Sequence, residues 1–195
     1  MNTQGVAALA VFAAVIVPMA RPTAAAQADG CSSQSAKRTG SAASQMELVL
    51  TVHQSRVSLR DTLVLDVALL NDGRRPVWVY AAVGWGSGAG LVMRIRNDEG
   101  REVRPQFGDD GMLPPPPSND DPTMFARLDQ GNFFGTRRRL RLKDFFAAPG
   151  RYTLQVEYQS LLACDILDPR LQGLHALWRE DGSLLSNEVA IDILP

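Results

Sequence analysis

The sequence has 195 residues, of which 45% are hydrophobic and 21% are charged, and its formal net charge is −1. This composition is that of a globular protein and excludes collagen-like, coiled-coil and wholly disordered chains. A net charge so close to zero also argues against a dedicated nucleic-acid-binding protein, which carries a strong basic excess. We therefore expect no nucleic-acid partner.

The first predicted element is an uncharged apolar run over residues 5–20, followed by small residues in which Ala24, Ala26 and Ala28 create two A-x-A patterns. The strongest part of this run is shorter than the ~20 residues that a membrane-spanning helix needs. We interpret residues 1–26 as a secretory signal peptide that is cleaved after Ala26 or Ala28. The predicted location is secreted or periplasmic, with no stable membrane insertion after cleavage. An uncleaved anchor is the alternative, because no Lys or Arg precedes the apolar run.

Residues 27–45 are mostly small and polar, and they predict a flexible leader. The leader contains Cys31, and the only other cysteine of the chain is Cys164. An oxidising compartment would permit a disulfide between them, which would tie the leader to the far end of the chain. The alternatives are two unpaired thiols and a lipid-modified Cys31, although Asp29 fits a lipidation signal poorly.

Residues 46–195 predict one domain of about seven β-strands. Apolar and polar residues alternate with a period of two, and clusters of turn residues separate the alternating segments. No helical segments alternate with the strands, so we do not expect a parallel α/β sheet. One helix is predicted from Asp168 to Trp178, because Asp168 can cap the first turn and Pro169 suits the first helical position. The predicted strands span residues 46–52, 62–70, 76–81, 91–96, 139–143, 152–159 and 188–193.

This layout resembles the immunoglobulin-like or fibronectin type III-like β-sandwich of extracellular proteins. Trp78 lies where such domains bury a tryptophan on the third strand, and Ala148-Pro149-Gly150-Arg151-Tyr152 is similar to the turn before their sixth strand. The resemblance implies an all-β, antiparallel sandwich with one short helix before the last strand. It also implies that Tyr152 is a tyrosine corner, whose hydroxyl bonds the backbone. Leu154 stands where antibody domains have a second core cysteine, so the resemblance concerns architecture and implies no particular function.

Two segments are candidate binding loops. The first is glycine-rich, spans residues 84–90 and could present Trp85 to a partner. Its loose G-x-G-x-x-A pattern precedes a strand rather than a helix, so it does not predict a dinucleotide site. The second is a long insertion at residues 105–135, with four consecutive prolines and candidate calcium ligands whose spacing fits no EF-hand. A solvated surface loop is the alternative, and we expect no cofactor and no metal. The acidic residues of the insertion are Asp109, Asp110, Asp120 and Asp121.

Arginines on two predicted strands form a candidate anion-binding face. The alternative is that they pair with acidic residues of neighbouring strands, such as Glu157 or Asp192, and keep the sheet soluble. The arginines of this candidate face are Arg94, Arg96, Arg139 and Arg141.

Two common enzyme motifs are missing from the sequence. It has no G-x-S-x-G segment, and its two histidines, His53 and His175, belong to no H-E-x-x-H motif. We therefore expect a non-enzymatic domain that binds a protein or a cell-envelope component through its loops. The alternatives are a small protease-inhibitor-like or carbohydrate-binding module on the same scaffold and, third, an enzyme without a recognisable motif.

Overall fold

The computed structural model describes residues 42–81, 83–86, 90–104, 122–164 and 174–195. This part of the chain is all-β, as the alternation predicts, and it contains eleven strands rather than about seven. The additional strands include three of only two or three residues, which are too short to show a periodic pattern. In chain order the elements are η1 (Ala42–Gln45), β1 (Met46–Val52), β2 (Arg56–Ser58), β3 (Thr62–Asn71), β4 (Val77–Tyr80), β5 (Gly84–Trp85), β6 (Gly90–Asn97), η2 (Pro122–Met124), β7 (Phe125–Leu128), β8 (Phe133–Arg141), α2 (Leu142–Phe145), β9 (Gly150–Gln159), η3 (Arg179–Asp181), β10 (Ser183–Leu185) and β11 (Val189–Leu194).

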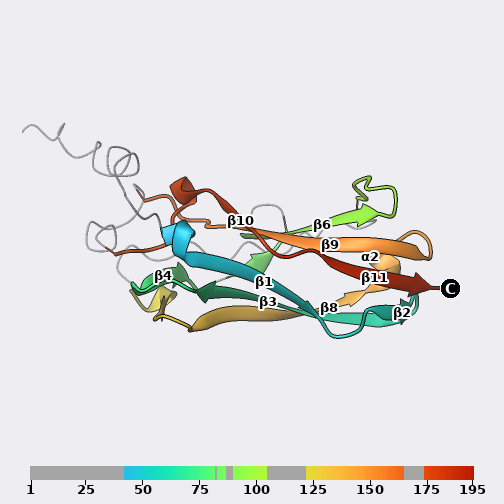
Figure 1. The fold of residues 1–195 in the computed structure, drawn as a ribbon, viewed down its shortest axis with the longest axis horizontal. Coiled ribbons are helices and arrows are strands. Elements are labelled where there is room, and N and C mark those ends of the chain that lie inside the picture. Colours follow the sequence, from blue (N-terminus) through green and yellow to red (C-terminus); the bar gives the residue numbers. More distant parts are fainter. Residues whose placement is uncertain (1–41, 82, 87–89, 105–121, 165–173) are drawn as a thin grey trace, which may run out of the picture.

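The strands form two layers that face each other (Figure 1). Sheet A is antiparallel and has the strand order β1-β3-β8. Sheet B has the order β2-β11-β9-β6-β5, with β10 also paired to β9. In sheet B the β2–β11 and β5–β6 pairs are parallel, whereas β9 pairs antiparallel with its neighbours. A short ladder between β4 and β7 lies at one end of the sandwich.

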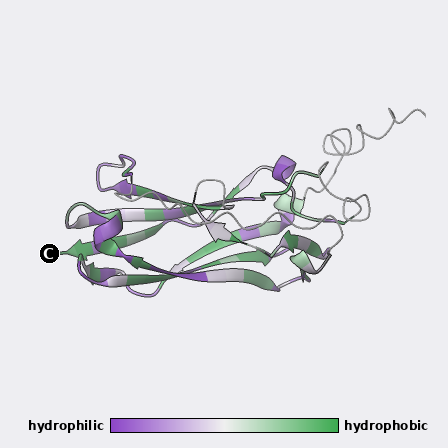
Figure 2. Ribbon diagram, turned by 180° about the vertical axis from the view of Figure 1, so that it is seen from behind, coloured by the Kyte–Doolittle hydropathy of each residue, from purple (hydrophilic) through white to green (hydrophobic). Residues whose placement is uncertain are grey.

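The main core lies between sheets A and B. Along β3 every second side chain, from Leu63 to Leu69, is buried, and along β9 the same holds from Tyr152 to Tyr158. Figure 2 shows the corresponding alternation of hydrophobic and hydrophilic segments along the strands. Because successive side chains of a strand point to opposite faces, this pattern fixes which face of each sheet is buried.

A second, smaller apolar cluster closes the end of the sandwich next to β4 and β7. Its centre is Trp178, which is 1% exposed and packs edge-on against Phe125 at 6.0 Å between ring centroids. Tyr80 contacts the other side of Phe125, also at 6.0 Å. The cluster shows that Trp178 is the fully buried tryptophan here, and that the prediction of Trp78 as the core tryptophan is wrong. Trp78 is only partly buried, because β4 pairs with β7 in a two-stranded ladder and belongs to neither of the two large sheets.

The described end of the predicted helix over Asp168–Trp178 is not helical. The backbone N–H of Trp78 donates to the carbonyl of His175 at 3.0 Å, and the N–H of Leu177 donates to the carbonyl of Trp78 at 2.9 Å. Residues 174–178 therefore run alongside β4, with a parallel bridge between Trp78 and Ala176. Leu174 and Trp178, two of the apolar residues whose spacing predicted the helix, pack in the end cluster from a segment that is not helical. The remainder of that prediction, residues 165–173, lies outside the described residues.

Two predicted boundaries shift in the structure. The C-terminal part of the predicted insertion at 105–135 contains η2, β7 and the start of β8, because Phe125 and Leu128 are buried by pairing with β4. Residues 105–121 lie outside the described residues. At the other boundary, η1 occupies the end of the predicted leader at 27–45 and buries Ala42, so residues 42–45 belong to the folded domain.

The hydrogen bond predicted for Tyr152 is present. The Tyr152 hydroxyl donates to the carbonyl oxygen of Ala148 at 2.9 Å, and the ring packs against Phe146 with centroids 4.7 Å apart. The hydrogen bond joins the first part of β9 to the turn that precedes it, so it fixes the entry angle of a central strand.

Replacing Tyr152 by phenylalanine is expected to lower the free energy of unfolding by about 1–2 kcal/mol. The ring and its contact with Phe146 remain, but the carbonyl of Ala148 loses its partner in a partly buried site. Urea denaturation followed by circular dichroism measures the change. Replacement of the exposed neighbour Arg151 by alanine is the control, with an expected change within about 0.5 kcal/mol. Equal stabilities of the two variants would contradict a structural role for the hydroxyl.

Candidate functional site

The outer face of sheet A carries a cluster of three ionisable side chains from three different strands or strand ends. The register of sheet A places Asp66 of β3 directly opposite Arg137 of β8. Nε and Nη2 of Arg137 donate to Oδ1 and Oδ2 of Asp66 at 2.7 and 3.0 Å. His53, just after β1, places its Nε2 2.7 Å from Oδ2 of Asp66. Each oxygen of the Asp66 carboxylate therefore accepts at least one hydrogen bond.

The hydrogen bonds from Arg137 and then from His53 hold the pKa of the Asp66 carboxyl well below its ordinary range. The same bonds to Asp66 raise the pKa of Arg137. Both groups therefore stay charged across the physiological pH range. Their bidentate geometry fixes the guanidinium plane, so the pair is a preformed polar feature of this face.

A groove of about 460 Å³ lies beside this cluster on the surface of β3 and β8. The floor of the groove is formed by Ala68 and Gly135, which are paired across the two strands. Neither residue has side-chain atoms beyond Cβ that would fill the groove. Phe133 lies toward one end of the groove, and the pair Asp66–Arg137 lies toward the other. The groove therefore offers an apolar end and a charged end on one surface.

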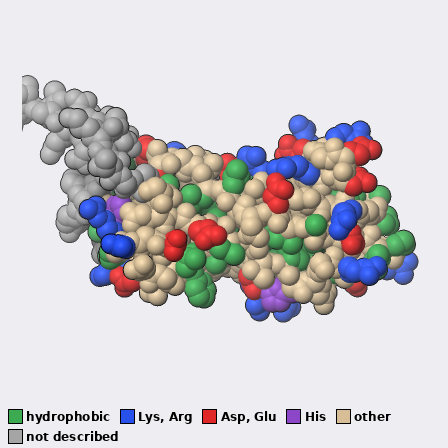
Figure 3. Space-filling view, in the orientation of Figure 1, with side chains coloured by type: hydrophobic (Ala, Val, Ile, Leu, Met, Phe, Trp, Pro, Cys, Tyr) green, Lys and Arg blue, Asp and Glu red, His purple; other side chains and the backbone are tan. Residues whose placement is uncertain are grey.

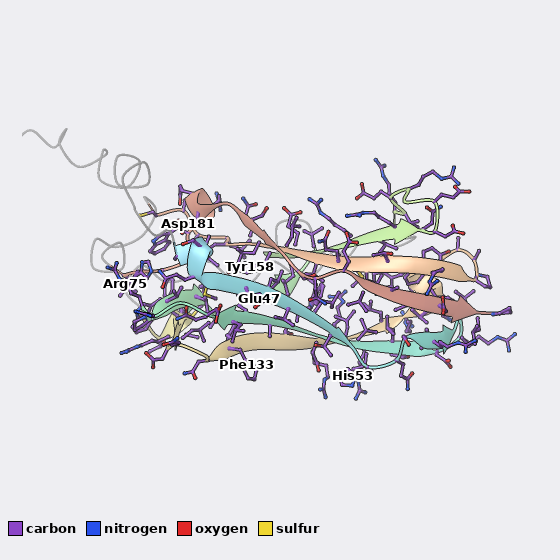
Figure 4. The ribbon with its side chains drawn as sticks, viewed as in Figure 1. Glu47, His53, Arg75, Phe133, Tyr158 and Asp181 are labelled. Carbon is purple, nitrogen blue, oxygen red and sulfur yellow. The ribbon has the colours of Figure 1, made fainter. Side chains whose placement is uncertain are left out.

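Phe133 is 70% exposed, which is unusual for a large aromatic side chain on a strand. In Figure 4 the side chains of Phe133 and His53 lie on the lower side of the molecule, which is the side of sheet A away from sheet B. Along the same lower edge, Figure 3 shows exposed hydrophobic surface and a histidine next to basic side chains. The outer face of sheet A thus combines apolar and polar groups that a ligand could contact together.

Trp85 is not a binding residue of an exposed loop. It lies on β5, which pairs in parallel with β6, and its side chain is only 7% exposed. The guanidinium carbon of Arg138 lies 5.1 Å from the centre of the indole ring, so β8 covers the ring with a cation–π contact. The prediction that Trp85 meets a partner directly is wrong, because strand pairing turns the ring into the sandwich.

The four arginines of the predicted anion-binding face do not share one face. Arg94 and Arg96 lie on β6 of sheet B, whereas Arg139 and Arg141 lie on β8 of sheet A. The prediction of a single basic face is therefore wrong. Period-two alternation identifies the exposed side of each strand, but it does not reveal which sheet the strand joins.

On sheet B these arginines pair with acidic side chains of neighbouring strands and loops. Arg94 Nη2 lies 2.5 Å from Oε2 of Glu157, which is the pairing that the sequence offered as the alternative. Arg96 Nη1 lies 2.9 Å from Oε1 of Glu188. These exposed pairs neutralise the outer face of sheet B, and each contributes only ~0–1 kcal/mol to stability.

The remaining predicted site residues lie wholly or partly outside the described residues. Cys164 is buried and disulfide-bonded, and its backbone N–H donates to Oε2 of Glu180 at 3.1 Å. Its predicted partner Cys31 lies outside the described residues, so their pairing stays a prediction. The candidate loop acids also lie outside: Asp109, Asp110, Asp120 and Asp121.

The described ranges contain no candidate metal site and no candidate membrane-spanning helix. Among these residues, no three His, Cys, Asp or Glu side chains gather closely enough to hold a metal ion. The helices of the same ranges are too short or too polar to traverse a bilayer.

The residues that make up the groove were not predicted from the sequence. Asp66 was expected on the polar side of a strand, and Phe133 fell inside the predicted insertion. Their proximity results from the β3–β8 register, which brings together positions about 70 residues apart in the chain. A usable signal was the sequence Phe133-Phe134-Gly135, because glycine between bulky strand residues indicates close backbone approach.

No family profile matches the chain, and no curated protein matches it. Solved structures to which the chain is similar include a β-glucosidase from Erythrobacter marinus, with 14% identity and a TM-score of 0.36 over 76% of this chain. A CARDB domain from Pyrococcus furiosus, solved with two metal ions, is 8% identical with a TM-score of 0.35 over 76% of this chain and 91% of its own. The alkylpurine DNA glycosylase AlkC of Pseudomonas fluorescens is 12% identical with a TM-score of 0.37 over 77% of this chain. The chain spans only 15% of the β-glucosidase and 31% of the DNA glycosylase.

Proposed function

We propose that the protein is an exported, non-enzymatic binding domain that holds a macromolecular ligand on the outer face of sheet A. The observation that carries this proposal is the exposure of Phe133 beside a groove floored by Ala68 and Gly135. Aromatic side chains, phenylalanine included, are enriched in the interfaces by which proteins bind their partners. The neighbouring pair Asp66–Arg137 supplies directed polar contacts that can select among ligands.

Two further features support the scaffold and location in this proposal. Tyr152 makes the backbone hydrogen bond of a tyrosine corner, which supports an immunoglobulin-like architecture. The apolar run at residues 5–20 and the small residues after it support export to the periplasm or the medium. Such sandwiches serve as rigid frames for recognition in extracellular proteins, and the groove lies on rigid strands rather than on loops.

The proposal is tested by photo-crosslinking from within the groove. A photoreactive phenylalanine analogue replaces Phe133 in one variant and Leu185 in the control variant. Leu185 is 52% exposed, but it lies on β10 of sheet B. After irradiation in the cell-envelope fraction, we expect discrete adducts from position 133 and none from position 185.

A substitution provides the quantitative counterpart of this experiment. Replacing Phe133 by serine is expected to lower the captured ligand about tenfold or more, because loss of an aromatic anchor costs ~2 kcal/mol of binding free energy. Serine at Leu185 is expected to leave capture unchanged. Equal adduct yields at both positions, or equal capture by both serine variants, would refute a binding site on sheet A.

A further inference from the structure

β8 is a long edge strand whose far side has no strand neighbour within the described residues. It spans Phe133–Arg141 and pairs with β3 alone. At one end of the ladder the N–H of Asn71 donates to the carbonyl of Asn132, and at the other the N–H of Leu142 donates to the carbonyl of Asp61. Hydrogen-bonded and non-hydrogen-bonded pairs alternate along an antiparallel ladder. These two bonds therefore fix which β8 residues direct their backbone groups toward β3.

The alternation directs the backbone N–H and C=O groups of every second β8 residue away from β3. Even-numbered residues from Phe134 to Leu140 bond to β3, since they fall in phase with Asn132 and Leu142. Odd-numbered residues present their donors and acceptors at the free edge. A row of this kind is the template on which another extended chain can pair. The residues that present these groups are Phe133, Gly135, Arg137, Arg139 and Arg141.

The inward side chains of β8 indicate that sheet A has room for one more strand beside β8. Phe134, Thr136 and Arg138 point into the sandwich, yet each is only partly buried. The inward side chains of the neighbouring β3, such as Leu65 and Val67, are almost completely buried. An additional strand beside β8 would cover this partly open side, in the same way that β8 covers β3.

The outward side chains of β8 define the chemistry of the chain that fits there. Arg137, Arg139 and Arg141 are all exposed along one side of the strand. Arg137 forms an ion pair with Asp66, and Arg141 forms one with Asp144. Arg139 forms no ion pair with the described residues. Cross-strand pairs of opposite charge stabilise a ladder, and like charges directly opposite each other destabilise it. In the register that pairs all of β8 with an antiparallel second copy, Arg137 would lie directly opposite Arg137, so this register disfavours self-association.

We propose that the ligand of sheet A is an extended acidic segment of another protein, which adds to the free edge of β8 as a further strand. This inference rests on the function proposed above and names the class of partner. Acidic residues at alternate positions of the segment face Arg137, Arg139 and Arg141, and an apolar residue at its end contacts Phe133. The repeat of two residues along a strand, ~6.8 Å, matches the spacing of these side chains along β8.

The test uses two synthetic nonapeptides and the purified protein labelled with nitrogen-15. One peptide alternates Glu with Thr or Val, and the other carries Lys in place of every Glu. Titration followed by NMR is expected to show binding of the Glu peptide and at least tenfold weaker binding of the Lys peptide. Hydrogen exchange in the bound state is expected to slow at the amides of Gly135, Arg137 and Arg139, whose N–H groups point to the free edge.

A proline substitution separates backbone pairing from charge. Arg139→Pro removes one N–H that points to the free edge of β8. Proline is tolerated at edge positions whose N–H faces solvent. Arg139→Ala removes the same charge but keeps the N–H. We expect the proline variant to bind the Glu peptide about tenfold more weakly than the alanine variant, since a backbone hydrogen bond is lost. Unchanged amide protection of β3 residues verifies that the proline variant is folded.

Several outcomes overturn the inference and leave the proposed function intact. One is equal affinity for the Glu and Lys peptides, and another is full binding by Arg139→Pro. A third is binding of an oligosaccharide from a glycan array that depends on Phe133 and leaves the β8 amides unprotected. Concentration-dependent dimerisation that Arg139→Pro abolishes would also overturn it, because a second copy would then occupy the edge. Absence of any adduct at position 133 in the photo-crosslinking experiment would instead refute the binding site itself.

Discussion

Replacing Asn71 by alanine is expected to lower the free energy of unfolding by about 3–4 kcal/mol. Asn71 is completely buried at the bend between the β3–β8 and β4–β7 ladders. Its Nδ2 donates to the carbonyls of Arg75 and Leu128 at 2.8 and 2.9 Å, and its Oδ1 accepts from the N–H of Gly73 at 3.0 Å. Alanine would leave these groups without partners, and each unsatisfied buried polar group costs ~1–3 kcal/mol.

Urea denaturation of the Asn71→Ala variant measures this loss. The control is alanine at Asp72, the next residue, which is exposed and is expected to change stability by less than about 0.5 kcal/mol. Because the two ladders meet at Asn71, the variant is also expected to lose protection from hydrogen exchange in β4 and β7 before β3. A loss below about 1 kcal/mol would show that the bend is held by its other contacts.

Replacing Gly135 by alanine is expected to lower the free energy of unfolding by about 2–3 kcal/mol. A Cβ atom at this position would lie 2.4 Å from the carbonyl oxygen of Val67 and 3.1 Å from Cα of Ala68. Both contacts are to backbone atoms of β3, which cannot rotate away. The strands must therefore separate, and steric overpacking of this kind typically costs ~1–3 kcal/mol.

The matched control for Gly135→Ala is Gly131→Ala. Gly131 has a φ of 77°, but an added Cβ would meet nothing within 4 Å. Its substitution costs only the backbone strain of ~1–2 kcal/mol. We expect Gly135→Ala to destabilise more than the control does, and to reduce ligand capture because the groove floor rises. A smaller loss at Gly135 than at Gly131 would contradict the close approach of β8 to β3.

Local features of the sequence were the most predictable. The alternation over 62–70 and 152–159 identified β3 and β9, since one face of each strand is buried along its whole length. The Tyr152 hydrogen bond was also predictable, because its acceptor lies only four residues upstream. In both cases the signal and the structure occupy the same few residues.

Features that depend on strand pairing could not be predicted in the same way. Only residues 139–143 were expected as a strand, but β8 begins at Phe133 and ends at Arg141, with α2 after it. The inward positions Phe134, Thr136 and Arg138 include only one apolar residue, because β8 is an edge strand over a partly open side. Alternation therefore fails where burial is incomplete, and the groove beside β8 escaped prediction with it.

The position of β11 in sheet B has a consequence for biosynthesis. β11 lies between β2 and β9, and its residues Asp192–Leu194 pair with Arg56–Ser58 of β2. A ribosome that adds ~5–20 residues per second produces β11 on the order of 10 s after β2. During that interval β2 lacks its partner strand β11, and β9 lacks β11 along one of its sides from Gly150 to Leu154. The β2–β11 and β9–β11 pairs of sheet B can therefore form only after translation has reached β11, and until then β2 and part of β9 are open to other pairing.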